Sequence, residues 1–231
     1  MYLTTATRAD IAFPVHQLCR CMACPTPELM DAVSHILIYL YFNRAVGLTY
    51  DSSRSELEGF SDASWETRFS TSGWVVFWKG AAIQWGSRKQ NCVSLSSCES
   101  EIVALSEASK DMVYFRKFVS GLDADSIDGP SPTSTDNKGA RDISYNPEHH
   151  NRIKHIQRRH FYVRDMVEAG ELVVPLVSTK DNHADFLTKC LDLPTFNKFR
   201  ASIMNIDPSP LKTQIRPHVV SVLPSAEPSA M

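Results

Sequence analysis

Four acidic residues stand where a carboxylate needs a partner, and together they could hold metal ions. The first, Asp62, lies within 57–65, a stretch with the apolar pattern of a strand. A carboxylate in a strand that packs on both faces is costly unless it is ion-paired, hydrogen-bonded or metal-bound. On this stretch alone, a turn aspartate beside Ser61 and Ser64 is the simpler interpretation. The other three acidic residues are Glu101, Asp136 and Asp185.

Glu101 falls in the first turn of a predicted long helix. Ser96 and Glu99 have the spacing of a capping box, and apolar residues from Leu105 to Val119 recur at helical spacing. Glu101 shares the face of Leu105, so we expect it to point at whatever the helix packs on, most simply the sheet that carries Asp62. The alternative is a glutamate favoured only by the helix dipole, but Glu99 already fills that role.

Two more strands are predicted directly after the first, over 72–78 and 81–85, with a turn at Lys79 and Gly80 between them. Asp136 is expected to end a short strand, and Asn137 to cap the helix that follows it.

Further elements are predicted toward the C-terminus. A helix is expected over 152–168, a strand over 172–177 that Pro175 confines to a sheet edge, and a helix that begins at Asn182 and carries Asp185 in its first turn.

Composition is that of a soluble globular protein, with 231 residues, 43% hydrophobic and 22% charged. A net charge of −2 excludes a global basic field, so nucleic-acid binding would need a local patch. The apolar window 29–42 is too short and too polar to span a bilayer, and no signal peptide is visible. Cys19, Cys21 and Cys24 lack a fourth ligand for a closed zinc site. We expect no membrane association and an intracellular location, cytoplasmic or nuclear.

Three regions are expected along the chain: a helical segment over 1–52, a main domain over 53–204 and a disordered tail over 205–231. The first should contain two helices, with Ile36 and Leu40 buried. A short edge strand is predicted over 47–50.

The order of the elements and six local motifs together resemble one family. Three strands, a helix, then strand, helix and strand, with the four carboxylates in sequence, match the layout of a ribonuclease H-like domain. The motifs closely resemble the ribonuclease H domain of copia-type retrotransposon polyproteins. They are 61–65, 70–74, 94–101, 135–137, 154–156 and 184–189.

The resemblance extends upstream, because 2–5 and 7–12 look like the segment that follows the polymerase palm in these polyproteins. It covers about residues 1 to 202. A Tyr-x-Asp-Asp polymerase signature is absent from the sequence, so we expect the end of a longer polyprotein without the polymerase site. Residues 1–52 would be what remains of the reverse transcriptase C-terminal segment.

The resemblance implies an α/β, ribonuclease H-like three-layer fold, in which a five-stranded mixed sheet carries helices on both faces after a small helical segment. It implies hydrolysis of the RNA strand of RNA–DNA hybrids with two Mg²⁺ ions, Mn²⁺ being the alternative ion. Asp62 would bridge both ions, Glu101 and Asp136 would hold one side, and Asp185 the other. His183 would assist proton transfer or product release; a helix-capping or solvent-facing histidine is an equal alternative.

A basic stripe and a few polar groups are candidates for contact with the nucleic acid. The stripe could follow phosphates, although such a face is usually only solvated. Ser64 and Asn137 could contact the 2′-hydroxyls that distinguish RNA from DNA. The basic residues are Arg152, Lys154, Arg158, Arg159 and Arg164.

The polymerase part of the same polyprotein is a further expected partner.

Two alternatives to the ribonuclease H function are considered. The main alternative is a ribonuclease H-like scaffold that binds nucleic acid or protein without cutting. It is favoured by Pro130 and Pro132, which weaken the strand before Asp136. An integrase-type nuclease is disfavoured, because there the glutamate comes last, whereas Glu101 comes second here.

Overall fold

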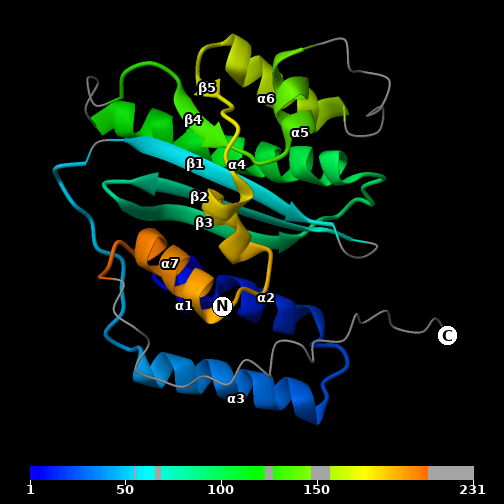
Figure 1. Ribbon diagram of the computed structural model, residues 1–231, viewed down its shortest axis with the longest axis vertical. Helices are drawn as coiled ribbons and strands as arrows, with labels where there is room; N and C mark the ends of the chain where they lie inside the picture. The colour runs from blue at the N-terminus through cyan, green and yellow to red at the C-terminus, as the bar shows by residue number, and fades with distance from the viewer. Residues whose placement is uncertain (55, 66–68, 123–126, 147–156, 208–231) are drawn as a thin grey trace.

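A five-stranded mixed sheet forms the centre of the computed structural model (Figure 1). The structure describes residues 1–54, 56–65, 69–122, 127–146 and 157–207, so the tail predicted over 205–231 lies almost wholly outside the described residues. The strand order is β3-β2-β1-β4-β5. β1, β2 and β3 form an antiparallel meander, and β4 and β5 continue the sheet parallel to β1. The strands are β1 (Leu57–Ser64), β2 (Thr71–Trp78), β3 (Ala81–Lys89), β4 (Ser131–Ser134) and β5 (Leu172–Val173).

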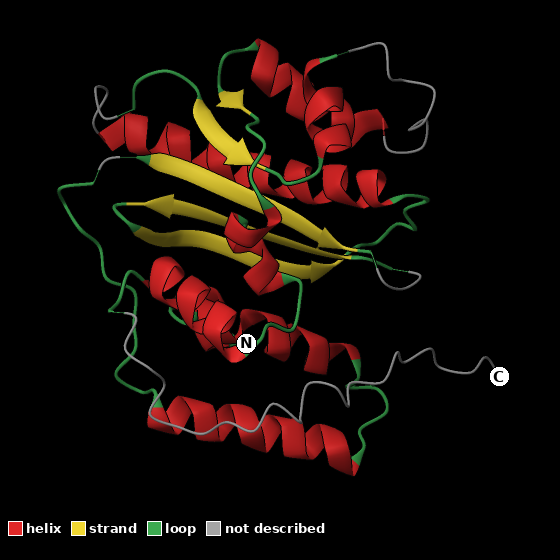
Figure 2. Ribbon diagram, in the orientation of Figure 1, coloured by secondary structure: helices red, strands yellow, loops and turns green. Residues whose placement is uncertain are grey.

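Helices cover both faces of the sheet, which confirms the predicted ribonuclease H-like three-layer fold (Figure 2). The α4–α6 group lies on one side of the sheet, and α1, α2 and α7 lie on the other, with α3 outside them. The helices are α1 (Tyr2–Ala6), η1 (Ala9–Ile11), α2 (Ala12–Arg20), α3 (Pro27–Phe42), α4 (Ser97–Leu122), α5 (Lys138–Tyr145), α6 (Gln157–Glu168), η3 (Thr179–Asp181), η4 (His183–Leu187) and α7 (Leu193–Met204).

Alternation along the strands builds a separate apolar core on each face of the sheet. Leu57 and Val76 pack with Met112 of α4 on one face. Phe60 and Val75 pack with Phe199 of α7 on the other. Because neighbouring side chains of a strand point to opposite faces, a single strand such as β1 contributes to both cores.

A buried ion pair joins the N-terminal helices to the rest of the molecule. Arg8 makes a bidentate contact to Asp10, with Nε 2.8 Å from Oδ1 and Nη2 2.6 Å from Oδ2. The Tyr39 hydroxyl of α3 donates to the same Asp10 carboxylate. Asn43, which accepts from Arg8 through its backbone oxygen, also accepts from Arg200 of α7 at 3.3 Å. The first 46 residues are therefore tied to the sheet through α7.

Two details of the sequence prediction are wrong. Residues 47–50 form no strand: the Thr49 N–H donates to the Met204 carbonyl oxygen instead of to a neighbouring strand. Ile36 and Leu40 are only half-buried, because Tyr39 is the side chain of that turn that faces inward.

The helix predicted to begin at Asn182 is confirmed as the short 3-10 helix η4, which Asn182 caps and which carries Asp185 in its first turn; α7 begins separately after the Asp192 cap, with Pro194 in its first turn. None of the helices among the described residues is long and apolar enough to cross a membrane.

We predict that Arg8→Met lowers the free energy of unfolding by about 3–5 kcal/mol, because it leaves the Asp10 carboxylate buried without its cation. Urea unfolding at neutral pH measures the change. Arg54→Met is the matched control: it breaks an Arg–Asp pair whose side chains are 57% and 46% exposed, and should cost under about 1 kcal/mol. Equal losses in the two variants would contradict a structural role for the buried pair.

Candidate active site

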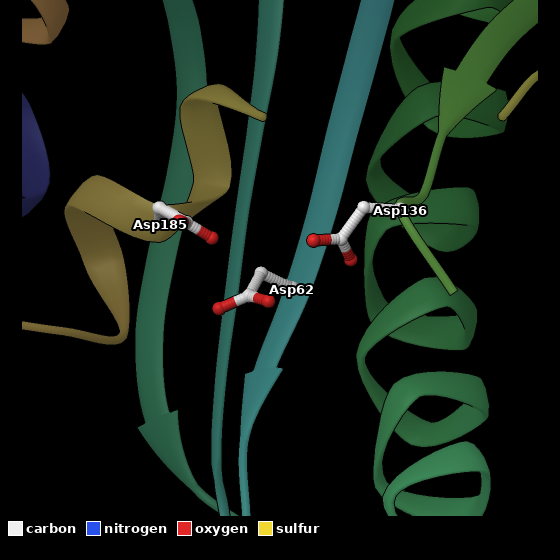
Figure 3. A group of neighbouring side chains, drawn as sticks. All are labelled: Asp62, Asp136 and Asp185. Carbon is white, nitrogen blue, oxygen red and sulfur yellow. The ribbon is translucent and has the colours of Figure 1, made fainter. Parts of the chain in front are cut away.

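Three of the four predicted carboxylates meet at one edge of the sheet. One oxygen each of Asp62, Asp136 and Asp185 lies within 4.8 Å of the other two. Figure 3 shows the three side chains converging from β1, from the segment after β4, and from η4. β1 and β4 are parallel neighbours, so their C-terminal ends bring Asp62 and Asp136 to the same edge. The prolines before Asp136 do not displace it, since Thr135 still bridges to Leu176.

Asp185 reaches Asp62 because η4 lies directly against β1 and β2. Asn182 is fully buried and caps η4 with its Oδ1, while its Nδ2 donates to the Ser61 carbonyl oxygen at 3.0 Å. Gly73 is the residue opposite Asp62 on β2. A Cβ at Gly73 would lie 2.5 Å from Thr188 Cγ2 and 2.9 Å from Leu187 Cβ. A glycine is needed here for the close approach of η4 to the sheet.

Glu101 approaches the aspartates from the α4 side, near enough for the charges of Asp62 and Asp136 to affect it, but it lies outside the group of three whose oxygens are within 4.8 Å of one another. Ser96 and Glu99 form the predicted cap, with Ser96 Oγ accepting from the Glu99 N–H and the Glu99 carboxylate accepting from the Leu95 N–H. The Glu101 side chain is buried, and its carboxylate accepts a hydrogen bond from the backbone N–H of Ala63, next to Asp62. Its Oε2 has no hydrogen-bond partner among the described residues. The carboxylate therefore has an oxygen available for a ligand.

Lys189 supplies a positive charge inside the acidic cluster. Its Nζ lies 2.8 Å from Asp185 Oδ1 and 3.4 Å from either oxygen of Asp62. The Thr188 hydroxyl donates to Asp62 Oδ2. On the opposite side, Asp136 Oδ2 accepts from Thr179 Oγ1 at 2.8 Å. The oxygens of Asp62 and Asp185 are thus partly neutralised from within the chain.

Burial and mutual repulsion disfavour the charged form of Glu101, Asp185 and Asp62. Burial, with the charges of Asp62 and Asp136, raises the pKa of Glu101 to about 9. Burial and the Asp62 charge raise the pKa of Asp185 to about 6, although Lys189 opposes the shift. The pKa of Asp62 is also raised, mainly by burial, against the influence of Lys189 and Thr188. Without bound metal, Glu101 holds a proton at neutral pH.

The structure does not support a catalytic role for His183. Its ring packs against three phenylalanines, with centroids 4.6 Å from Phe60, 5.3 Å from Phe77 and 5.4 Å from Phe199. Nε2 lies 2.8 Å from Ser202 Oγ. Burial, with the nearby Lys198 charge, lowers the pKa of His183 to about 4. His183 is therefore a neutral residue of the α7 interface rather than a proton carrier for the carboxylates.

The predicted nucleic-acid contacts are only partly described. Lys154 and the side chain of Arg158 lie outside the described residues. Arg159 is half-buried, with Nη1 3.5 Å from Cys92 Sγ. Ser64 is buried at the end of β1, and Asn137 caps α5 by accepting from the Ala140 N–H at 3.0 Å. The contact of these residues with nucleic acid remains a prediction.

Four residues that hold the site together were not predicted as site residues from the sequence. Asn182, Thr188 and Lys189 bind Asp62 or its neighbour from the η4 segment. Gln90 is buried after β3 and donates through Nε2 to Ser72 Oγ and to the Ser100 carbonyl oxygen, each at 2.9 Å. Thr188 and Lys189 stand three and four residues after Asp185, a spacing that could have signalled side chains near the same carboxylate.

Comparison with known proteins places the chain in a family. It is 35% identical over 193 residues, 82% of its length, to the retrovirus-related Pol polyprotein from transposon TNT 1-94 of Nicotiana tabacum. It is 34% identical over 202 residues, 85% of its length, to the corresponding polyprotein from transposon RE1 of Arabidopsis thaliana. The chain belongs to the retrovirus-related Pol polyproteins of copia-type transposons. It spans 14% of the length of each of these two polyproteins.

The chain also resembles a shorter protein. The secreted RxLR effector protein 161 of Plasmopara viticola is 39% identical over 119 residues, which are 49% of this Pol chain and 84% of the effector. No protein-family model matches the chain.

Two solved ribonuclease H structures resemble the chain over 58% of its length. RNase H1 of Halobacterium salinarum gives a TM-score of 0.44 at 13% identity over 94% of that protein. LC11-RNase H1 in complex with an RNA/DNA hybrid gives a TM-score of 0.40 at 15% identity, also over 94% of that protein.

We predict that the stability of the metal-free protein falls as pH rises from about 5 to about 9. The Glu101 pKa is about 9 in the folded protein against an ordinary 4.5, so between these values the folded state holds a proton that the unfolded state has released. Glu101→Gln removes this penalty and should be more stable than wild type at pH 8, by a margin that grows with pH. Urea unfolding in EDTA at pH 5, 7 and 9 tests this. A margin independent of pH would contradict it.

We also predict that Gly73→Ala lowers the free energy of unfolding by about 1–3 kcal/mol, because the added methyl group overpacks the contact with Thr188 and Leu187. Gly47→Ala is the matched control, since nothing lies within 4 Å of a Cβ added there. Urea unfolding of both variants is the measurement. A loss for Gly73→Ala no larger than for Gly47→Ala would show that η4 does not depend on this close approach.

Proposed function

We propose that the chain is the ribonuclease H part of a copia-type Pol polyprotein and hydrolyses the RNA strand of RNA–DNA hybrids with divalent metal ions. One observation carries the proposal. Asp62, Asp136 and Asp185 converge within 4.8 Å, and the nearby Glu101 carboxyl group has a buried oxygen without a hydrogen-bond partner in the described part of the chain. Aspartate oxygens that repel one another, with an unpartnered carboxyl oxygen nearby, favour a cation as a common ligand.

The residues present fit a divalent metal of the hard type. All the candidate ligands are carboxylate oxygens, which Mg²⁺ and Mn²⁺ prefer, and they come from β1, α4, η4 and the segment between β4 and α5. Asp62 is central, with Glu101 and Asp136 on one side and Asp185 on the other. When bound, the ions would activate a water molecule and stabilise the oxygen that leaves the phosphodiester.

The chain's own residues fix the ligands in place. Asn182 holds η4, and with it Asp185, against the backbone of Ser61. The Ala63 N–H orients the Glu101 carboxylate, and Thr188 orients Asp62. Such groups limit how far the ligands must reorganise when a cation binds.

Recognition of the hybrid would come from groups next to the carboxylates. We place Ser64, at the end of β1, and Asn137, the cap of α5, near the RNA strand, which carries the 2′-hydroxyls. Lys154, Arg158 and Arg159 are the proposed phosphate contacts.

A contact with the polymerase part of the polyprotein is also proposed. Residues 1–52 would form the link between the two parts. The outward face of α3 offers apolar side chains for such a contact, because a cluster of this kind marks an interaction surface more often than a free one. These side chains are Met30, Leu37, Ile38, Tyr41 and Phe42, each at least 50% exposed.

The second candidate function is a scaffold that does not cut nucleic acid. The contacts of Lys189 with Asp62 and Asp185 favour it. Its ammonium group satisfies Asp62 and Asp185 without any metal. In that case the cluster would serve only to hold η4 on the sheet.

Asp62→Asn separates the two functions. For the nuclease we expect Mg²⁺-dependent cleavage of a labelled RNA–DNA hybrid to fall by at least about a thousandfold, since several kcal/mol of transition-state stabilisation are lost. The metal-free variant should be no less stable than wild type, because one repelling charge is removed at nearly constant shape. Asp181→Asn, which removes a carboxylate that is 62% exposed, is the matched control and should cleave normally.

The scaffold would be supported by the opposite result. Wild-type protein that is folded yet cleaves no hybrid in millimolar Mg²⁺ or Mn²⁺, together with an Asp62→Asn variant that melts well below it, would rule out the nuclease.

A further inference from the structure

We propose that Lys189 controls access to the second metal position, because its ammonium group occupies the space between Asp62 and Asp185. A divalent ion can then bind both of these carboxylates only by displacing the lysine. The inference rests on the proposed function, and it assigns a specific role to a residue of the same site.

The contacts of Lys189 define which half of the cluster it occupies. Nζ lies 2.8 Å from Asp185 Oδ1 and 3.4 Å from both oxygens of Asp62, so the ammonium group lies at hydrogen-bonding or ion-pair distance from two of the three aspartates. A metal ion shared by Asp62 and Asp185 would meet both oxygens of Asp62 and Oδ1 of Asp185 already in contact with the ammonium group. The lysine and the metal ion therefore compete for that position.

The other half of the cluster has no such cation among the described residues. The Asp136 carboxylate accepts from the neutral hydroxyl of Thr179, and Glu101 Oε2 is buried without a hydrogen-bond partner. Of the three carboxylates that would hold an ion there (Asp62, Asp136 and Glu101), the ammonium group contacts only Asp62, at 3.4 Å, whereas its contact with Asp185 is 2.8 Å. The two metal positions are consequently unequal, and the first ion should bind on the Glu101 side.

Lys189 is placed so that it can leave. Its side chain is 33% exposed, and the next residue, Cys190, is exposed at the surface. A lysine has a flexible four-carbon stem and a compact charge that is strongly hydrated in water. Displacement therefore requires a change in the lysine side chain alone, and it does not require η4 to move.

The consequence is a weak second metal position in the wild-type protein. An ion that enters must first compete with a charge-assisted contact that is already formed. Replacing Lys189 with an uncharged residue of similar length should remove the competition. Replacing it with arginine keeps the positive charge and should preserve the competition.

Metal titration of the full chain tests the proposal without measuring activity. Mn²⁺ binding is followed by calorimetry and by the electron paramagnetic resonance signal of the free ion, for wild type, Lys189→Met, Lys189→Arg and Lys110→Met. Lys110 is the matched control, because its Nζ also lies 2.9 Å from a carboxylate, that of Glu107, on the exposed side of α4. We expect Lys189→Met to bind the second ion at least tenfold more tightly than wild type does, and the other two variants to match wild type.

Two results would overturn the proposal. One is a second-ion affinity in Lys189→Met equal to that of wild type, in protein shown to be folded by circular dichroism. The other is the absence of Mn²⁺ binding from wild type and Lys189→Met alike. The proposed function fails separately: if the isotherms differ as expected but wild type cleaves no RNA–DNA hybrid, the site binds metal under lysine control without acting as a nuclease.

Discussion

The repulsion among converging carboxyl groups is the constraint on which the rest of this structure depends. Two unit charges about 4 Å apart cost about 4 kcal/mol at an effective dielectric constant near 20, and here one oxygen from each of three aspartates lies within 4.8 Å of the others. The metal-free protein meets this cost in two ways. Lys189 lies between Asp62 and Asp185, and Glu101 keeps its proton because burial and its acidic neighbours raise its pKa to about 9. A divalent cation, if it binds as proposed, would reverse both arrangements.

The fold places the carboxylates close together by using close backbone approach rather than long side chains. Parallel pairing of β1 with β4 aligns Asp62 with Asp136, and the glycine at position 73 lets η4 lie against the sheet. Asn182 then locks that helix to the carbonyl oxygen of Ser61. The bidentate Arg8–Asp10 pair plays the corresponding part on the α7 side of the sheet, where it joins the N-terminal helices to the molecule.

Much of the sheet and the grouping of the acidic residues could be predicted from sequence, because both depend on local patterns. Alternating apolar residues indicate β1 to β3, and the spacing of Ser96 and Glu99 indicates where α4 begins and hence where Glu101 points. The surroundings of each carboxylate could not be predicted in the same way. His183 stands two residues before Asp185, yet on a 3-10 helix its ring turns toward Phe60 and Phe199, away from the carboxylates. The pairing of Lys189 with Asp62 joins residues 127 positions apart, which sequence spacing alone does not reveal.

In the proposed site, Asp62, Asp136 and Glu101 form a position for a divalent cation. Anomalous diffraction from crystals of the full chain grown with Mn²⁺ tests it most directly. We expect an anomalous peak among these three carboxylates at low Mn²⁺, and a second peak between Asp62 and Asp185 only when the Lys189 side chain has moved away. Crystals without a peak at any Mn²⁺ concentration, with Glu101 still buried and Lys189 still paired to Asp185, would contradict it.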